Sequence, residues 1–209
     1  MLHKHKFFWL QKSFVLSSLF GAMLLIVSFF ANYYANAYIA SHASNYVTDI
    51  LLDNLPVVNV QFLFSEGALL FLIFVIITLL VEPKYIPFSL KSIAVFIIVR
   101  SFFLVLTHMA PPANEIYIDP NDFISRFSWG NDLFFSSHTG LPFLMALIFK
   151  KHHNLNYFFF TCSAIGGITV LLGHLHYSID VFSALFISYG IYHISKHLFT
   201  SDFRRINQG

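Results

Sequence analysis

The chain has 209 residues, of which 57% are hydrophobic, 19% are aromatic and only 11% are charged. Soluble domains carry about 25% charged residues, so this composition excludes a soluble enzyme and a disordered chain. The lone cysteine, Cys162, excludes a disulfide scaffold. A formal net charge of +2 without a basic stripe argues against nucleic-acid binding. Composition therefore predicts an integral membrane protein, and no linker or repeat divides it, so residues 1–209 are expected to form one domain.

Six apolar runs are long enough to cross a bilayer as helices, which takes about 20 mostly apolar residues. In chain order they cover residues 13–37, 62–81, 89–109, 133–149, 155–172 and 176–199. Their apolar residues come in continuous runs rather than in alternation, which favours helices over a β-barrel. The sequence therefore predicts an all-α bundle of six transmembrane helices.

Charge is divided between the two sides of this predicted bundle. The basic side carries Lys4, Lys6, Lys12, Lys84, Lys91, Lys150, Lys151, Lys196, Arg204 and Arg205. The acidic side carries Asp49, Asp53, Glu115, Asp119, Asp122, Asp132 and Asp180, with Arg126 as its only basic residue. Basic loops stay in the cytoplasm, so both termini are predicted to be cytoplasmic and the acidic loops to face outward.

Two further expectations concern processing and location. Lys4 and Lys6 precede a long apolar run, and Ala35-Asn36-Ala37 resembles a cleavage site, so residues 1–37 could be a signal peptide. Cleavage would leave five spans with the same orientation. The sequence contains no Asn-x-Ser/Thr acceptor, which favours a bacterial plasma membrane with the acidic loops in the periplasm.

The sixth run begins with a pair suited to chemistry, His176 and Asp180. On a helix, a spacing of four places both side chains on one face. The carboxylate could then accept a hydrogen bond from one imidazole nitrogen and leave the other as a free lone pair, as a nucleophile or base requires. The alternative is a polar pair that merely begins a helix, because this spacing is common by chance.

The fourth run begins with hydroxyl side chains around a histidine. Ser136 and Ser137 precede His138, and Thr139 follows it. The first-turn N–H groups of a helix lack partners, so a start lined by small hydroxyl residues is suited to bind a phosphate. In the alternative reading, His138 is an ordinary residue at the membrane interface.

Arg100 lies within the third predicted span. An arginine near the centre of a span costs about 2.5–3.5 kcal/mol on insertion scales, so its side chain should face the bundle interior or a wet cavity. A bound phosphate could compensate the charge, and so could an ion pair with Glu66, near the outer end of the second span. Both readings stay open at this point.

Together these segments resemble the type 2 phosphatidic acid phosphatase superfamily and, within it, the sphingomyelin synthase branch. That branch has a Gly-Asp-x-x-x-Ser-Gly-His-Thr segment and a His-x-His-Tyr-Thr-x-Asp-Val segment. The similar positions here are Asn131, Asp132, Ser136, Ser137, His138 and Thr139 in one motif and His174, His176, Tyr177, Ser178, Asp180 and Val181 in the other. Further similar positions are Arg100, Thr107 and Pro112 in the third span and its following loop, and Asp49 and Asp53 in the first outer loop.

The chain also departs from the patterns of these families. Ser137 replaces the motif glycine, and the Lys-rich first motif of the broader superfamily is missing. Thr169 and Val170 stand where that superfamily has a Ser-Arg pair. The sphingomyelin synthase branch lacks this pair too, which favours the branch over the plain lipid phosphatases.

The resemblance implies two-step phosphoryl transfer without a metal or other cofactor. His176 would attack a lipid phosphorus with Asp180 stabilising the imidazolium, and His138 would act as acid and then as base. Arg100, Ser136, Ser137 and Thr139 would hold the phosphate, and Asp132, His174 and Tyr177 would support the site. The partners would be membrane lipids, with a phospholipid as donor and ceramide or diacylglycerol as acceptor.

Two alternatives remain from the sequence. With water as acceptor, the same three residues would make a lipid or polyprenyl phosphate phosphatase or a phospholipase C-like hydrolase. A non-enzymatic haem or metal carrier is the third reading, with His193 and His197 four residues apart near the basic side.

Overall fold

The computed structural model describes residues 2–42, 44–118 and 133–207, with side chains from residue 5 onward. Within these ranges the regular structure is entirely helical, which confirms the all-α prediction there. The elements are α1 (Leu2–Trp9), α2 (Lys12–Ala40), η1 (Leu52–Asn54), α3 (Gln61–Val81), η2 (Pro83–Tyr85), α4 (Ile86–Leu106), α5 (Ser137–Ile148), α6 (His153–Leu172), α7 (Ser178–Leu198) and α8 (Thr200–Asn207).

Each of the six apolar runs contains a helix, but the helices differ in their capacity to span a bilayer. Four segments of the described chain are long and apolar enough to cross a membrane: Lys12–Ala40, Gln61–Val81, Pro83–Leu106 and His153–Leu172. The run 133–149 forms only α5, whose 12 residues measure about 18 Å, less than the roughly 30 Å of bilayer hydrocarbon. The 21 residues of α7 are long enough but more polar, with Asp180 in the first turn and Lys196 in the last.

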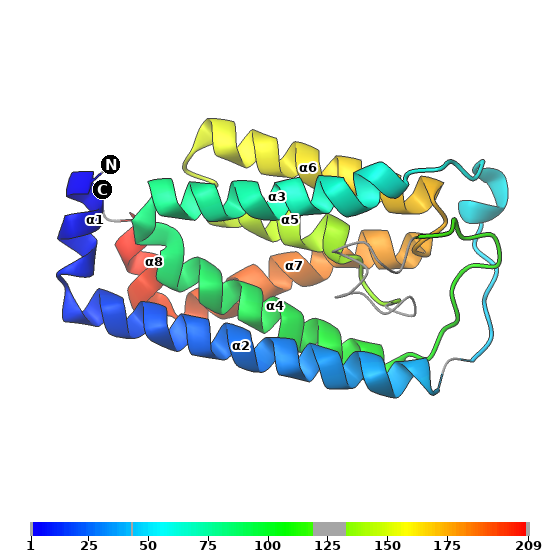
Figure 1. Cartoon of the computed structure of the whole chain (residues 1–209), viewed down its shortest axis with the longest axis horizontal. Helices are drawn as coiled ribbons and strands as arrows, with labels where there is room; N and C mark the ends of the chain where they lie inside the picture. The colour runs from blue at the N-terminus through cyan, green and yellow to red at the C-terminus, as the bar shows by residue number, and fades with distance from the viewer. Residues whose placement is uncertain (1, 43, 119–132, 208–209) are drawn as a thin grey trace.

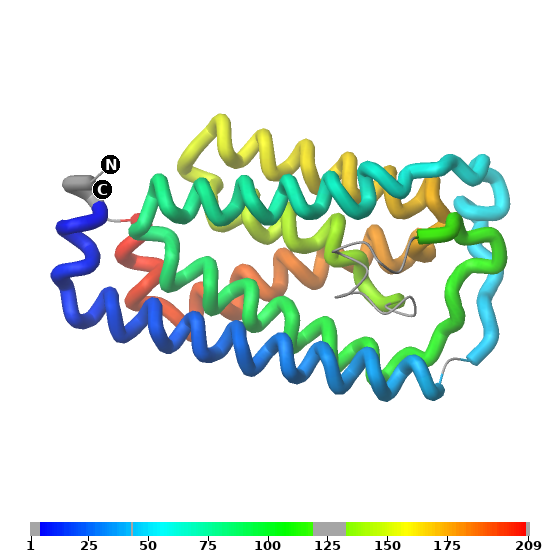
Figure 2. The backbone as a smooth tube through the Cα atoms, viewed as in Figure 1, coloured from blue at the N-terminus to red at the C-terminus, as the bar shows by residue number. Residues whose placement is uncertain are grey.

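The long helices run side by side along the bundle, and α2 lies along α4 for most of its length (Figures 1 and 2). The short helix α5 packs between α6 and α7, and α3 packs on α6. The main core is aromatic and aliphatic, with Phe96, Leu144, Phe149 and Phe159 among its buried members. The core thus surrounds α5, the helix whose start carries His138.

One end of the bundle, here called the α8 end, carries α1, set crosswise to α2, and α8 (Figure 1). Lys91 belongs to the predicted basic side, but it lies within a helix: α4 begins at Ile86, with a proline in its first turn, and includes Lys91. Its ammonium is buried and lies 2.6 Å from Oδ2 of Asp202 in α8, and Arg205 donates to Oδ1 of the same carboxylate at 2.9 Å. This ion network holds α8 against α4.

The opposite end, here called the loop end, is formed by the segments that follow α2, α4 and α6. Backbone N–H groups join these segments: Ser44 donates to His108 at 2.7 Å, Val58 to Leu172 at 2.8 Å and Ile116 to Gly173 at 3.0 Å. The starts of α5 and α7, which carry the candidate catalytic residues, lie beneath these connected loops.

Candidate active site

The His176–Asp180 pair forms, but not on one helical face. Helix α7 begins at Ser178 with Tyr177 as its N-cap, so His176 lies outside the helix. The Asp180 carboxylate reaches back to the helix start, where its Oδ2 accepts the Tyr177 N–H at 3.1 Å and lies 3.3 Å from Nδ1 of His176. The predicted contact between His176 and Asp180 is therefore present. It does not arise from a shared helical face, as predicted, because Asp180 reaches back across the start of the helix.

This pair is buried, with 5% of His176 and none of Asp180 exposed to solvent. The geometry suits the tautomer in which Nδ1–H donates to Asp180, so that Nε2 carries the lone pair. The second carboxylate oxygen, Oδ1, is buried and accepts no hydrogen bond from the described part of the chain. A buried polar atom left without a partner costs about 1–3 kcal/mol, so Oδ1 is a position where a further donor would stabilise the site.

The start of α5 is rich in unsatisfied polar groups. Ser136 is the N-cap residue, but its side chain makes no capping hydrogen bond. Its Oγ and the Oγ1 of Thr139 are buried, and neither finds a partner within the described ranges. Ser137, which follows the N-cap, is half-buried. The first-turn N–H groups and these hydroxyls together form a polar, anion-compatible helix start.

His138 lies in the first turn of α5 and is oriented by α3. Its ring stacks on Phe64 with the centroids 4.2 Å apart, and its Nε2 lies 3.2 Å from the Phe64 carbonyl oxygen. No local pattern in the sequence indicates Phe64 as a neighbour of this histidine. The contact fixes the imidazole plane at the beginning of the helix.

The peptide group between Phe135 and Ser136 joins the starts of α5 and α7 to each other and to α4. The Ser136 N–H donates to the Asp180 carbonyl at 3.0 Å, and Nε of Arg100 donates to the Phe135 carbonyl at 3.1 Å. Phe135 has φ = 26°, in the left-handed region that non-glycine residues rarely adopt. Three helices that are far apart in the sequence thus meet at this strained residue.

Arg100 is buried, with 4% of its surface exposed, as predicted for a charge within a helical bundle. Glu66, its candidate ion-pair partner, lies exposed on α3. No ion pair between Arg100 and Glu66 occurs in the described structure, so that reading loses its support. The bond to Phe135 instead places Arg100 directly against the start of α5.

Two adjacent glycines of α6 allow α5 to approach closely. A Cβ atom at Gly166 would lie 2.2 Å from the carbonyl oxygen of His138, and one at Gly167 would lie 3.1 Å from Val181 and 3.3 Å from Thr139. The observed position of His138 therefore requires a glycine at position 166. Its importance depends on tertiary contact, which no local sequence pattern reveals.

The three residues expected to support the site have different positions. His174 adopts φ = 52° and its Nε2 lies 3.3 Å from the Leu55 carbonyl oxygen. Tyr177 is buried, and its hydroxyl donates to the Ala110 carbonyl at 2.8 Å and accepts the Val47 N–H at 3.2 Å. Asp132 lies outside the described residues.

Asp49 belongs to the site region through a contact that the sequence did not reveal. Its Oδ2 accepts the N–H of Ser178, the first residue of α7, at 2.7 Å. Its Oδ1 accepts the N–H groups of Leu51 at 2.9 Å and Leu52 at 3.2 Å. Burial opposes ionisation, but hydrogen bonds from Ser178, Leu52 and Leu51 outweigh it and lower the pKa of Asp49 below 3.8. Asp53, four residues later, is exposed.

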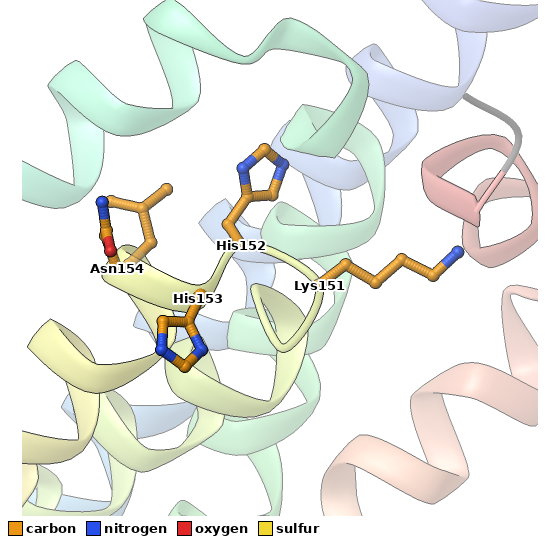
Figure 3. A pocket seen from close by; sticks show the side chains of 5 residues that line it. Lys151, His152, His153 and Asn154 are labelled. Carbon is orange, nitrogen blue, oxygen red and sulfur yellow. The ribbon is translucent and has the colours of Figure 1, made fainter.

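Other candidate sites lie elsewhere. No group of three or more His, Cys, Asp or Glu side chains that could hold a metal occurs in the described ranges. A shallow pocket lined by residues 151–155 lies between α5 and α6 at the α8 end, with His152 and His153 among its lining residues (Figure 3). His193 and His197 are exposed on α7. These features are separate from the starts of α5 and α7.

The fold and site together define a helical protein with membrane-length apolar helices and a buried His–Asp pair at one end. A family model described as PAP2 superfamily C-terminal matches residues 130–198, about a third of the chain. The matched segment contains both histidine motifs and supports a relationship to the type 2 phosphatidic acid phosphatase superfamily.

A curated relative gives a shorter match. The chain is 36% identical over 61 residues to the uncharacterized protein MJ0662 of Methanocaldococcus jannaschii. This alignment covers 29% of the chain and 26% of the relative, so the chain spans about a quarter of that protein's length. No solved structure matches the chain.

Proposed function

We propose that the chain is an integral membrane phosphotransferase that moves a phospholipid head-group phosphate ester to a lipid hydroxyl. The observation that carries this proposal is the buried His176–Asp180 pair, whose helix start is hydrogen-bonded to the helix start that bears His138. The family match over residues 130–198 supports phosphatase-type or phosphotransferase-type lipid chemistry. The motif likeness to the sphingomyelin synthase branch supports transfer to ceramide or diacylglycerol.

In the first step, Nε2 of His176 forms a bond to the phosphorus of the donor as the bond from phosphorus to the departing lipid oxygen breaks. His138 donates a proton to that oxygen, and Asp180 stabilises the imidazolium through Nδ1. In the second step, His138 removes the proton of the acceptor hydroxyl, whose oxygen attacks the phosphohistidine and releases His176. The bonds and protons of both steps balance without a metal or redox cofactor.

The charge on the phosphoryl oxygens requires donors that are already in position. The N–H groups at the start of α5 are suited to this task, with the hydroxyls of Ser136, Ser137 and Thr139 beside them. Arg100 lies against the same helix start through its bond to Phe135. We assign these groups to phosphate binding, and His174 and Tyr177 to support of the His176 turn.

The proposal includes an orientation. Exposed basic side chains gather near the α8 end, among them Lys150, Lys151, Lys196 and Arg204. By the positive-inside rule, a membrane bundle of six helices would hold this end in the cytoplasm. The active site would then open on the extracytoplasmic face, which in a bacterial inner membrane is the periplasm.

A hydrolase is the second candidate, because the matched family is named for phosphatidic acid phosphatase activity. Water would then replace the lipid hydroxyl in the second step, and the same three residues would act. The two functions differ in the acceptor alone, so product analysis separates them.

The test is one assay on purified protein in mixed micelles. It supplies fluorescent ceramide and diacylglycerol as acceptors, phosphatidylcholine and phosphatidylethanolamine as donors, and phosphatidic acid in a parallel tube. We expect a new fluorescent phospholipid that His176→Ala abolishes and that His153→Ala, at the α8 end, leaves unchanged. Free phosphate from phosphatidic acid without a transfer product would establish the hydrolase instead. Transfer that persists in His176→Ala would refute the proposed nucleophile.

A further inference from the structure

We propose that Asp49 is a positioning residue that holds the first turn of α7, and with it the His176–Asp180 pair, in its reactive shape. The catalytic consequence of this assignment rests on the proposed function above. The evidence is the 2.7 Å hydrogen bond from the Ser178 N–H to Oδ2 of Asp49. Ser178 lies between the two members of the pair, so a shift of its backbone displaces both.

The Asp49 carboxylate is itself held firmly before it contacts α7. Its Oδ1 accepts the N–H groups of Leu51 and Leu52, and its carbonyl oxygen accepts the Asp53 N–H at 2.8 Å. These bonds fold the loop into the short helix η1. The second oxygen is thereby presented in a fixed direction, which a surface carboxylate on a mobile side chain could not do.

Charge favours the same contact. Ser178 is the first residue of α7, so its N–H has no acceptor within the helix. The N-terminus of a helix also carries partial positive charge, which favours an anion at this position. The bond from Ser178 thus satisfies a backbone group that would otherwise remain unpaired beneath the loops.

Tyr177 holds the neighbouring residue of the same turn. Its hydroxyl joins the Val47 N–H and the Ala110 carbonyl, and only 1% of the residue is exposed. Asp49 and Tyr177 together anchor positions 177 and 178 to the loops that follow α2 and α4. The 3.3 Å contact between His176 and Asp180 therefore depends on residues of these loops as well as on the capping bond within the first turn.

Asp53 provides a matched control for Asp49. It has the same charge and belongs to the same loop, but its side chain is exposed and makes no hydrogen bond in the described structure. Asp53→Asn removes one negative charge without removing the anchor. Asp49→Asn removes the charge and weakens the three N–H contacts.

The first measurement reads the imidazole directly and needs no turnover. Selective ¹⁵N labelling of histidine, with His176 assigned from the spectrum of His176→Ala, reports which ring nitrogen carries the proton. We expect wild-type protein and Asp53→Asn to share the Nδ1–H tautomer at His176, and Asp49→Asn to lose this preference. An unchanged His176 signal in Asp49→Asn would overturn the proposal.

The second measurement is steady-state transfer in micelles. We expect Asp49→Asn to lower kcat by about tenfold or more with KM changed less than twofold, because displacement of a reacting group by about 1 Å can cost about a hundredfold. Asp53→Asn should stay within twofold of wild type in both. Equal kcat values for the two variants would also overturn the proposal.

A third variant covers the case in which Asp49→Asn does not fold. Tyr177→Phe removes only the second anchor, and we expect it to shift the His176 resonance and to lower kcat. A Tyr177→Phe protein identical to wild type in both would refute control by the loops. If wild-type protein shows no His176-dependent activity, the proposed function fails, whereas the ¹⁵N result still decides the role of Asp49.

Discussion

Substitution of Gly166 by alanine is the sharpest perturbation of the site that avoids every reacting group. The added methyl carbon would lie 2.2 Å from the carbonyl oxygen and 2.8 Å from the carbonyl carbon of His138. Ordinary contact begins at 3.4 Å, so α6 or the first turn of α5 must move by about 1 Å. The backbone on the other side of this contact belongs to the proposed acid–base residue.

Two energies of opposite sign decide the stability of Gly166→Ala. Alanine favours a helix over glycine by about 0.8–1 kcal/mol. Overpacking in a tight interface costs about 1–3 kcal/mol, and here the neighbour is backbone, which yields less easily than a side chain. We expect a net loss of about 1–2 kcal/mol and, from the displacement of His138, a loss of turnover of at least tenfold.

Gly190→Ala is the matched control. Gly190 also lies within a helix, α7, but no heavy atom lies within 4 Å of the Cβ position. This variant should gain up to about 1 kcal/mol and keep wild-type activity. Thermal unfolding in detergent and the transfer assay measure both variants. If Gly166→Ala matches Gly190→Ala in stability and turnover, the close approach of α6 to His138 is refuted.

Four further predictions concern charged side chains. Asp180→Ala should abolish turnover and cost about 0.5–2 kcal/mol in thermal unfolding, because the carboxylate also caps α7; full activity would contradict its role. Arg100→Lys should weaken substrate binding by more than tenfold in KM, since lysine lacks the planar guanidinium fork, and a wild-type KM would argue against phosphate contact. Lys91→Met or Asp202→Leu alone should destabilise by about 3–5 kcal/mol, whereas in chemical denaturation the double variant should lose less than the sum. The melting-temperature difference between wild type and Asp49→Asn should stay constant above about pH 5 and shrink as the pH falls below 3.8, because a lowered pKa stabilises the fold only while the carboxylate is charged; a difference that grows in acid would reverse this sign.

The helical class and the approximate helix positions could be predicted because apolar runs are a local signal. The predicted run 62–81 corresponds to α3 at Gln61–Val81, and the run 155–172 to α6 at His153–Leu172. Helix ends were less accurate where polar residues continue the chain. The charge of Lys91 indicated only that it belongs to the basic side, because its buried partner Asp202 is too distant in the sequence to be recognised beforehand.

The candidate site shows a different limit. A spacing of four between His176 and Asp180 fits two geometries: both residues on one helical face, or an aspartate that reaches back over the start of a helix. The contact between them was therefore predictable from the sequence, but its geometry was not. Asp49 and Phe64 act through neighbours more than 70 residues away in the chain, and Gly166 acts through His138, 28 residues before it. Phe64 and Gly166 carry no local signature, and for Asp49 the sequence indicated a family-like position but not its contact with Ser178.

The level of Gly166 in α6 has a consequence for the surrounding lipid. His138 lies beside Gly166, and α6 continues beyond it to Leu172, which adds about 9 Å at 1.5 Å per residue. With the tip of α6 at the outer boundary of the hydrocarbon, the backbone of His138 lies about a third of the way into a layer roughly 30 Å thick. A phosphate can reach this depth only if the bilayer thins around the protein or the lipid is drawn inward, at a cost of fractions of a kcal/mol per ångström. Under the proposed function, acyl-chain length is then expected to affect the rate, because short-chain bilayers bring head groups closer to the site before any contact is made.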